Sequence, residues 1–188
     1  MTIGGTGVML LGCLLSLVVF VGLARLLRPR LGPVTSVAIA GFCWTVVCIG
    51  ILTLIPAQWG IGVVPVDEAQ TTCSLDYGGP APDGFWILPG SQRLLNIAVF
   101  VPAGALWVLA VARWRTRWVL APLGLAALAL YSLLIEATQL AASRIGRACD
   151  VTDMVDNIVG VLLGGLLGVV LALLLRPWDH RPRPTLGA

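Results

Sequence analysis

Residues 154–175, MVDNIVGVLLGGLLGVVLALLL, decide the fold class of this 188-residue chain. The stretch carries a single charge, on Asp156. A helix rises about 1.5 Å per residue, so a helix of this length crosses a hydrocarbon core of roughly 30 Å. Four other apolar stretches of similar length carry one charge or none: 8–27, 36–55, 94–112 and 118–140. We therefore predict an all-α integral membrane protein with five transmembrane helices.

The composition agrees with lipid as the solvent. Hydrophobic residues make up 58% of the chain, charged residues make up 11%, and the mean hydropathy is +0.95. A soluble domain of this size is far less apolar. The stretch 8–27 also lacks the positively charged leader of a secretory signal, because its arginine lies near its end. We predict that it is retained as a helix.

The arginines predict the orientation of the chain. All twelve basic residues are arginines, and nine of them fall in three segments: Arg25, Arg28 and Arg30; Arg113, Arg115 and Arg117; and Arg176, Arg181 and Arg183. The positive-inside bias assigns these three segments to the cytoplasm. The N-terminus is then outside and the C-terminus is cytoplasmic. The formal net charge is +3, but no soluble basic face is evident, so we expect no nucleic-acid partner.

We predict three regions along the chain. Residues 1–92 contain two transmembrane helices and a long outer loop that is rich in Gly and Pro. Residues 93–175 contain the other three helices. Residues 176–188 are too short and too polar to fold alone, and we expect a disordered cytoplasmic tail.

Two of the five cysteines fall in the predicted outer loops. These are Cys73 and Cys149, whereas the other three lie inside apolar stretches. A disulfide between Cys73 and Cys149 is possible on the outer side of the membrane. It requires Cα atoms within about 7 Å of each other, which the sequence leaves open.

Polar residues at membrane depth gather at the predicted outer ends of the helices. Ionisable groups there cost a few kcal/mol each, so they indicate a functional region. The candidate ligand-binding residues are Asn96, Glu136, Gln139, Arg147, Asp150, Asp153 and Asn157. We expect them to form a polar pocket that opens to the outer leaflet.

Small residues recur at helical spacing below this region. Such residues let membrane helices approach closely, and the candidates are Gly104, Ser132, Gly160, Gly164 and Gly168. We expect helices 118–140 and 154–175 to pack through their small-residue stripes. Glu136, Gln139, Asp153 and Asn157 would then converge above the contact.

Structural explanations stay open for several of these residues. Asp150 and Asp153 also fit the capping of a helix N-terminus, and Asp156 fits a structural charge favoured by the helix dipole. Glu136 is compatible with a structural ion pair with Arg144 or Arg147. The side chains of these two arginines are equally compatible with solvation by water or with binding to lipid phosphate. The two asparagines, Asn96 and Asn157, fit hydrogen bonds between helices.

Three motifs in order resemble the pattern of VanZ-like proteins. They are an N-x-x-x-F-x-P-x-G stretch at Asn96, Phe100, Pro102 and Gly104; an S-x-x-x-E-x-x-Q stretch at Ser132, Glu136 and Gln139; and an R-x-x-D-x-x-D-x-x-x-N-x-x-G-x-x-x-G stretch at Arg147, Asp150, Asp153, Asn157, Gly160 and Gly164. The resemblance covers 93–175. It implies a multi-pass protein of the bacterial plasma membrane and a link to resistance to the glycopeptide teicoplanin, whose target is a peptidoglycan precursor at the outer surface.

Three kinds of function are compatible with these residues. The favoured one is a non-enzymatic envelope protein that binds a lipid-linked or peptide ligand, or a partner, through the outer pocket. The second is a membrane enzyme in which Glu136 and either Asp150 or Asp153 act as general acid and base, with a divalent cation held by the carboxylates. Transport is less favoured, because the polar groups lie near one face and no repeat is evident.

The only histidine narrows the chemistry further. His180 lies on the predicted inner tail, which excludes Ser–His hydrolysis and a His-ligated zinc at the outer face. We predict no cofactor and no metal site, with membrane lipids and a lipid-linked envelope precursor as partners. The sequence leaves the oligomeric state open.

Overall fold

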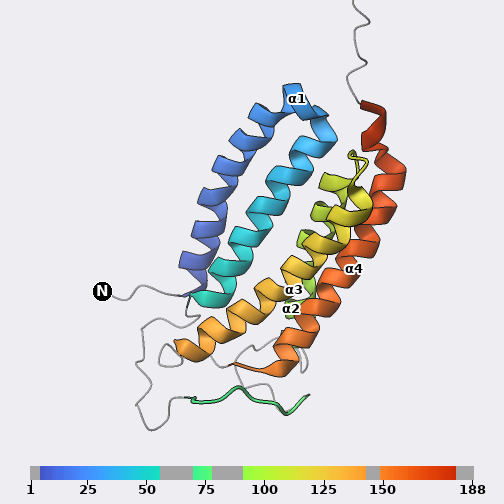
Figure 1. Ribbon diagram of the computed structural model, residues 1–188. Coiled ribbons are helices and arrows are strands. Elements are labelled where there is room, and N and C mark those ends of the chain that lie inside the picture. Colours follow the sequence, from blue (N-terminus) through green and yellow to red (C-terminus); the bar gives the residue numbers. More distant parts are fainter. Residues whose placement is uncertain (1–4, 56–69, 78–90, 143–148, 181–188) are drawn as a thin grey trace, which may run out of the picture.

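The computed structural model describes residues 5–55, 70–77, 91–142 and 149–180. Within them the chain forms four α-helices and a terminal 3-10 helix, and no strand (Figure 1). The helices are α1 (Thr6–Leu54), α2 (Ser91–Val111), α3 (Arg117–Ala141) and α4 (Val151–Leu175), and η2 (Pro177–His180) follows α4. The predicted all-α class is confirmed. All four α-helices are long and apolar enough to cross a membrane.

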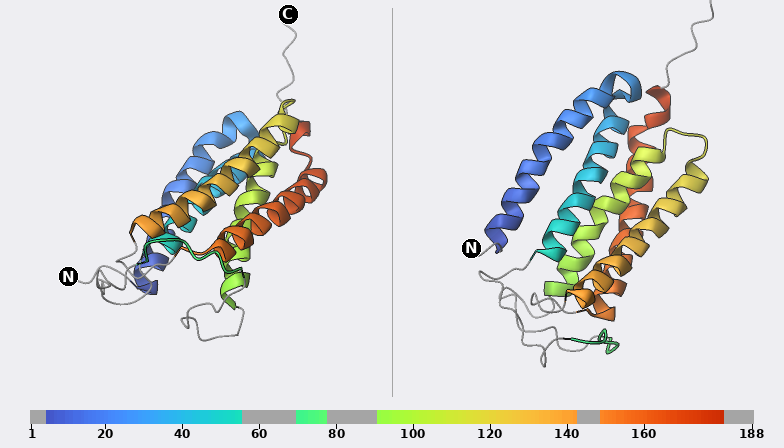
Figure 2. Two further views of the ribbon diagram at one scale, coloured as in Figure 1. Left: turned by 60° about the horizontal axis from the view of Figure 1, so that its bottom comes forward. Right: turned by 60° about the vertical axis from the view of Figure 1, so that its left-hand side comes forward.

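Helix α1 is two antiparallel limbs joined by a sharp bend. Its 49 residues would extend about 74 Å if straight, more than twice the hydrocarbon thickness. Gly32 breaks the helix with φ 76° and ψ 169°, a conformation open to glycine, and Pro29 and Pro33 flank it. The first limb, 6–31, and the second limb, 33–54, lie side by side in two orientations of the molecule (Figures 1 and 2).

The two limbs of α1 hold each other directly. Nε1 of Trp44 donates to the carbonyl oxygen of Cys13 at 2.9 Å, and Ile51 packs against Gly12. The sequence predicted separate helices at 8–27 and 36–55. The structure instead continues helical backbone through most of the predicted connection, because only Gly32 leaves the helical region.

The glycines of α4 pack against α2. A Cβ atom on Gly160, Gly164 or Gly168 would collide with a backbone carbonyl oxygen of α2, from Ile97, Val101 and Ala105 respectively. The sequence predicts instead that this stripe faces the helix 118–140, which is α3. The difference follows from what each helix presents: α2 offers Gly104 and the small Ala105, so two backbones can meet, whereas α3 meets Gly165 with the side chain of Leu125.

A buried cluster joins all four helices. Ile49 of α1, Phe100 and Ala103 of α2, Leu128 and Ile135 of α3, and Val161 of α4 form it. Large apolar side chains also cover the outside of the bundle, including Leu166 and Leu173 of α4. Exposed apolar surface on this scale suits contact with lipid rather than water.

The bundle has two chemically different ends. The bend of α1, the C-termini of α2 and α4 and the N-terminus of α3 meet at one end, which we call the arginine end. Its described arginines are Arg25, Arg28, Arg30, Arg113, Arg115, Arg117 and Arg176. The opposite end, where α2 and α4 begin and α3 finishes, is the carboxylate end, with Glu136, Asp150, Asp153 and Asp156.

Candidate functional site at the carboxylate end

A short segment, 70–77, lies across the start of α4. Cys73 and Cys149 form a disulfide with Cα atoms 4.8 Å apart. Ser74 and Asp150 form an isolated parallel bridge, in which the N–H of Ser74 donates to the Cys149 oxygen at 3.0 Å and the N–H of Val151 donates to the Ser74 oxygen at 3.0 Å. The disulfide and these bonds fix the 70–77 segment beside the polar residues.

Gln70 strengthens this attachment from the other end of the segment. Its Nε2 donates to the Cys149 oxygen at 2.9 Å, and its Oε1 accepts from the Cys149 N–H at 2.7 Å. Both backbone polar groups of the buried Cys149 are therefore satisfied by the 70–77 segment.

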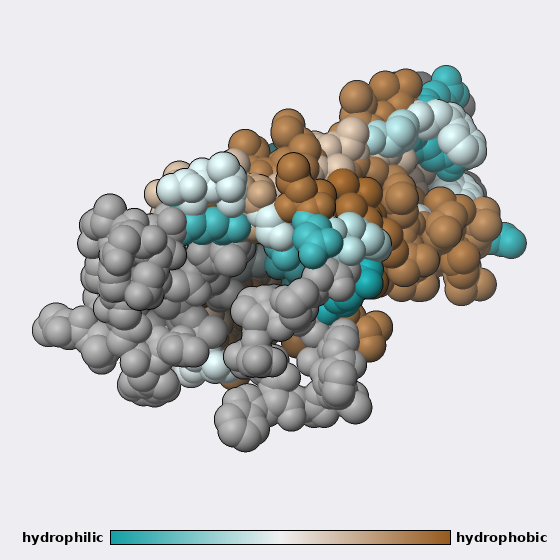
Figure 3. Space-filling model, turned by 90° about the horizontal axis from the view of Figure 1, so that it is seen from below, coloured by the Kyte–Doolittle hydropathy of each residue, from teal (hydrophilic) through white to brown (hydrophobic). Residues whose placement is uncertain are grey.

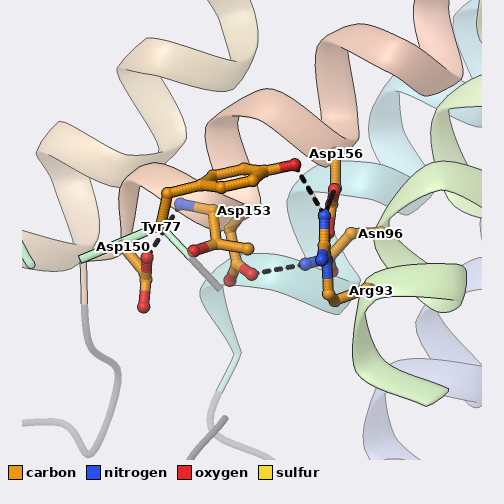
Figure 4. Close-up of polar contacts among 7 residues, drawn as sticks. Tyr77, Arg93, Asn96, Asp150, Asp153 and Asp156 are labelled. Atoms are coloured by element: carbon orange, nitrogen blue, oxygen red, sulfur yellow. Dashed lines mark hydrogen bonds and ion pairs between the residues drawn. The ribbon is translucent and has the colours of Figure 1, made fainter. Parts of the chain in front are cut away.

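Arg93 and Asp156 form a two-bond ion pair between α2 and α4. Nε donates to Oδ2 at 2.8 Å and Nη2 donates to Oδ1 at 2.9 Å. Nη2 also donates to the Tyr77 hydroxyl at 2.8 Å, and the guanidinium lies 5.1 Å from the centre of the Tyr77 ring (Figure 4). Asp156 is 2% exposed, so the structural charge predicted from the helix dipole has a specific partner.

A second bond between the same helices lies nearby. Nδ2 of Asn96 donates to Oδ1 of Asp153 at 2.6 Å (Figure 4). Asp153 is in the first turn of α4, where the helix dipole also favours its negative charge. Two of the predicted site residues are thus brought together across α2 and α4.

Asp150 is the N-cap of α4. Its backbone is extended, and its Oδ1 accepts from the N–H of Thr152 at 2.8 Å. The N–H of Asp150 in turn donates to Oε2 of Glu136 at 3.1 Å. Glu136, which is 2% exposed, therefore connects the end of α3 to the start of α4.

Two amide side chains also connect α3 to its neighbours. Nδ2 of Asn157 donates to the Ser132 hydroxyl at 3.0 Å, and both residues are buried. Nε2 of Gln139 donates to the carbonyl oxygen of Thr53 on α1 at 3.0 Å. Oε1 of Gln139 is buried and, among the described residues, has no hydrogen-bond partner.

Among the described residues, Glu136, Gln139, Asp153 and Asn157, which are predicted to converge, each bond to a different partner. Asp153 turns to α2, Glu136 to the N–H of Asp150, Asn157 to Ser132 and Gln139 to α1. Arg147, another predicted site residue, and Arg144 lie outside the described residues. Hydrophilic side chains show at the surface of this end between apolar helix flanks (Figure 3).

Arg93 and Tyr77 also belong to this site and are not among the residues predicted from sequence. A signal existed for Arg93: it precedes Asn96 by three residues on α2, as Asp153 precedes Asp156 on α4, so both helices present a pair on one face. Tyr77 carried no such signal, because its position depends on the fold of the loop. Within the described part of the chain, no group of three or more His, Cys, Asp or Glu residues is placed to hold a metal ion.

Helices of this length and apolarity, with polar side chains paired at one end, define a helical membrane protein. The chain belongs to the VanZ/LLP1 family, whose model matches residues 8–176. The predicted resemblance is confirmed, and the match extends beyond 93–175 into the N-terminal part of the chain. No curated protein matches the chain, and no solved structure does.

Proposed function

We propose that this VanZ-family protein is a non-enzymatic, multi-pass protein of the bacterial plasma membrane that binds an anionic envelope ligand at its carboxylate end. The ligand class is a lipid-linked peptidoglycan precursor or a related peptide, which carries phosphate or carboxylate groups. We also propose that the chain crosses the membrane five times, with the two limbs of α1 counted separately, and that the carboxylate end faces outward. The arginines at the opposite end support this orientation through the positive-inside bias.

The main support for the proposal is the position and the hydrogen bonding of the Arg93 guanidinium. Three of the five N–H groups of its guanidinium are used, by the two oxygens of Asp156 and by Tyr77. Its Nη1 has no partner among the described residues, and the side chain is 44% exposed. The guanidinium is thus held in one orientation, with two donors that no described residue binds, and such donors suit an incoming phosphate or carboxylate.

The groups around Arg93 support selection of a ligand by its shape and hydrogen-bonding groups as well as by its charge. Tyr77, 56% exposed, offers a ring and a hydroxyl beside the guanidinium. Asp153, paired with Asn96, is partly exposed and adds a negative charge to the same region. An anionic ligand that also carries donors, as a peptide-bearing precursor does, matches this combination.

The experiment is ligand capture by native mass spectrometry in lipid nanodiscs. The probes are a lipid-linked peptidoglycan precursor and its carrier lipid phosphate without sugar or peptide. Arg93→Lys keeps a charge for Asp156 but removes the planar donors. The matched control is Arg115→Lys, which changes an exposed arginine at the opposite end.

We expect precursor binding to the wild type and to Arg115→Lys, and weaker binding to Arg93→Lys. The charge-removing variant Glu136→Gln, with Asp179→Asn as its control, measures whether the buried carboxylate contributes. Equal precursor binding by folded Arg93→Lys and wild type would overturn the proposal. Conversion of the precursor to a product would instead support the enzymatic alternative.

The link to glycopeptide resistance belongs to the same proposal. If the protein binds a precursor at the outer surface, its presence should alter how a host bacterium responds to teicoplanin. Expression of wild type in a susceptible host, compared with Arg93→Lys at equal abundance, tests this. Identical susceptibility with and without the wild-type protein would separate this chain from the resistance that the family name suggests.

A further inference from the structure

A groove of about 420 Å³ lies between the two limbs of α1, near the arginine end. Its volume falls in the range of small-molecule sites, roughly 300–1,000 Å³. Phe20 and Val21 line it from the first limb, and Val37 and Ala40 line it from the second. Val21 and Val37 are exposed, so the groove opens toward the side of the bundle.

The interior of the groove is apolar because its polar groups are already paired. The Trp44 indole N–H donates to the Cys13 oxygen, and the buried Ser36 hydroxyl donates to the Gly32 oxygen at 2.6 Å. Neither group needs a hydrogen bond from an occupant. A hydrocarbon chain therefore fits these walls better than a polar ligand does.

Two arginines line the same groove toward the bend of α1. Arg25 and Arg28 are three residues apart, so their side chains share one face of the first limb. Both are exposed, and neither has a partner among the described residues. At the whole arginine end the described residues include seven arginines and a single carboxylate, on Asp179.

We propose that this groove binds an anionic membrane phospholipid. One acyl chain lies between the limbs of α1, and the headgroup phosphate lies between Arg25 and Arg28. A basic pocket between transmembrane helices at headgroup level recognises phosphate, and long arginine side chains reach it while their stems stay in apolar surroundings. The site is separate from the carboxylate end and does not depend on the proposed function.

The test is native mass spectrometry of the full chain with phosphatidylglycerol and phosphatidylcholine of matched acyl chains. Arg25→Gln/Arg28→Gln removes the proposed phosphate contacts. Arg30→Gln/Arg115→Gln is the control, because it removes the same charge from the same end outside the groove. We expect phosphatidylglycerol to be retained preferentially by wild type and control, and about tenfold less by the groove variant.

A second pair of variants tests the acyl-chain part of the site. Val21→Trp fills the groove, whereas Val18→Trp places the same ring on an exposed position of the same limb that does not line it. Lipid retention should fall for Val21→Trp only. This pair keeps the test valid if the arginine variant fails to fold.

Three results would overturn the proposal. Equal retention of phosphatidylcholine and phosphatidylglycerol would remove the role of the headgroup charge. An equal loss of phosphatidylglycerol retention in the groove variant and in its control would mean that the lipid is attracted diffusely by the charge of the arginine end. Protein dimers that dissociate in Val21→Trp, without a change in lipid retention, would assign the groove to a second copy of the chain.

Discussion

The guanidinium of Arg93 and the carboxylate of Asp156 join α2 to α4 through two hydrogen bonds of 2.8 and 2.9 Å. Asp156 is buried and Arg93 is partly exposed, so the partners differ in what each loses when the other is removed. A solvated arginine tolerates the loss of its partner better than a buried carboxylate does. Removing Arg93 and removing the charge of Asp156 should therefore destabilise the protein to different extents.

Asp156→Asn should lower the unfolding temperature less than Arg93→Gln does. The asparagine keeps one acceptor for Arg93, whereas Arg93→Gln leaves a buried carboxylate without its cation. Thermal unfolding in one detergent, with Asp179→Asn as the exposed control, measures the order. Equal unfolding temperatures for all three variants would mean that the ion pair contributes nothing measurable to stability.

The glycine contact between α4 and α2 predicts a position-specific cost. A Cβ atom at Gly164 meets backbone atoms of Val101 and Ala105, which cannot rotate away as a side chain does. Gly164→Ala should therefore destabilise the protein by about 1–3 kcal/mol, the usual cost of overpacking. The measurement is the free energy of unfolding by a chemical denaturant in mixed micelles.

The control for this substitution is Gly22→Ala. Apart from the adjacent backbone of its own helix, no atom of the described residues lies within 4 Å of a Cβ at that position in α1. Alanine is also the better helix former by up to about 1 kcal/mol. Gly22→Ala should be neutral or stabilising, and a similar loss in both variants would contradict the close approach of α4 to α2.

The Cys73–Cys149 disulfide closes a long stretch of chain, since 76 positions separate the two residues. Peptide mapping without reduction should recover these two cysteines in one linked fragment and leave the thiols of Cys13, Cys43 and Cys48 free. The double variant Cys73→Ser/Cys149→Ser should lose about 2–4 kcal/mol of stability. Alkylation of all five cysteines without a reductant would show that the pair does not form.

The segregation of charges to the ends of the helices could be predicted from sequence because it depends on hydropathy and helical spacing alone. The all-α class and the placement of Asn96 and Asp153 at the helix ends away from the arginine end follow from the same local information. The partner of the glycine stripe could not be predicted in this way. The glycine stripe on α4 predicts close approach to the backbone of another helix. Which helix that is depends on the matching small residues around Gly104, which lie on α2.

The contacts of Tyr77 and Gln139 could not be predicted from the sequence either, because both depend on residues far away along the chain. Tyr77 reaches Arg93 because the disulfide and the Ser74–Asp150 bridge fix the 70–77 segment, and such long-range contacts have no sequence period. The sequence predicts Gln139 close to Asp153, but Nε2 of Gln139 donates to the Thr53 oxygen instead. The end of α1 offers a free carbonyl there because the last turn of a helix leaves its oxygens unpaired.

The orientation of the chain can be tested through two exposed positions at opposite ends. Leu75, in the 70–77 segment, is 80% exposed, and Arg115 lies exposed at the turn between α2 and α3. Each is changed to cysteine in a variant whose Cys13, Cys43 and Cys48 are replaced by serine. The disulfide partners stay in place, so a single reactive thiol is present in each protein.

A membrane-impermeant maleimide added to intact cells should label Leu75→Cys and leave Arg115→Cys unlabelled until the cells are lysed. The physical reason is the arginine distribution, because nine of the twelve arginines lie in the segments assigned to the cytoplasmic side. Labelling in the opposite pattern would invert the topology and place the Arg93 site in the cytoplasm. Labelling of both positions in intact cells would place them on the same side of the membrane. It would contradict a single crossing by α2, the only helix described between them.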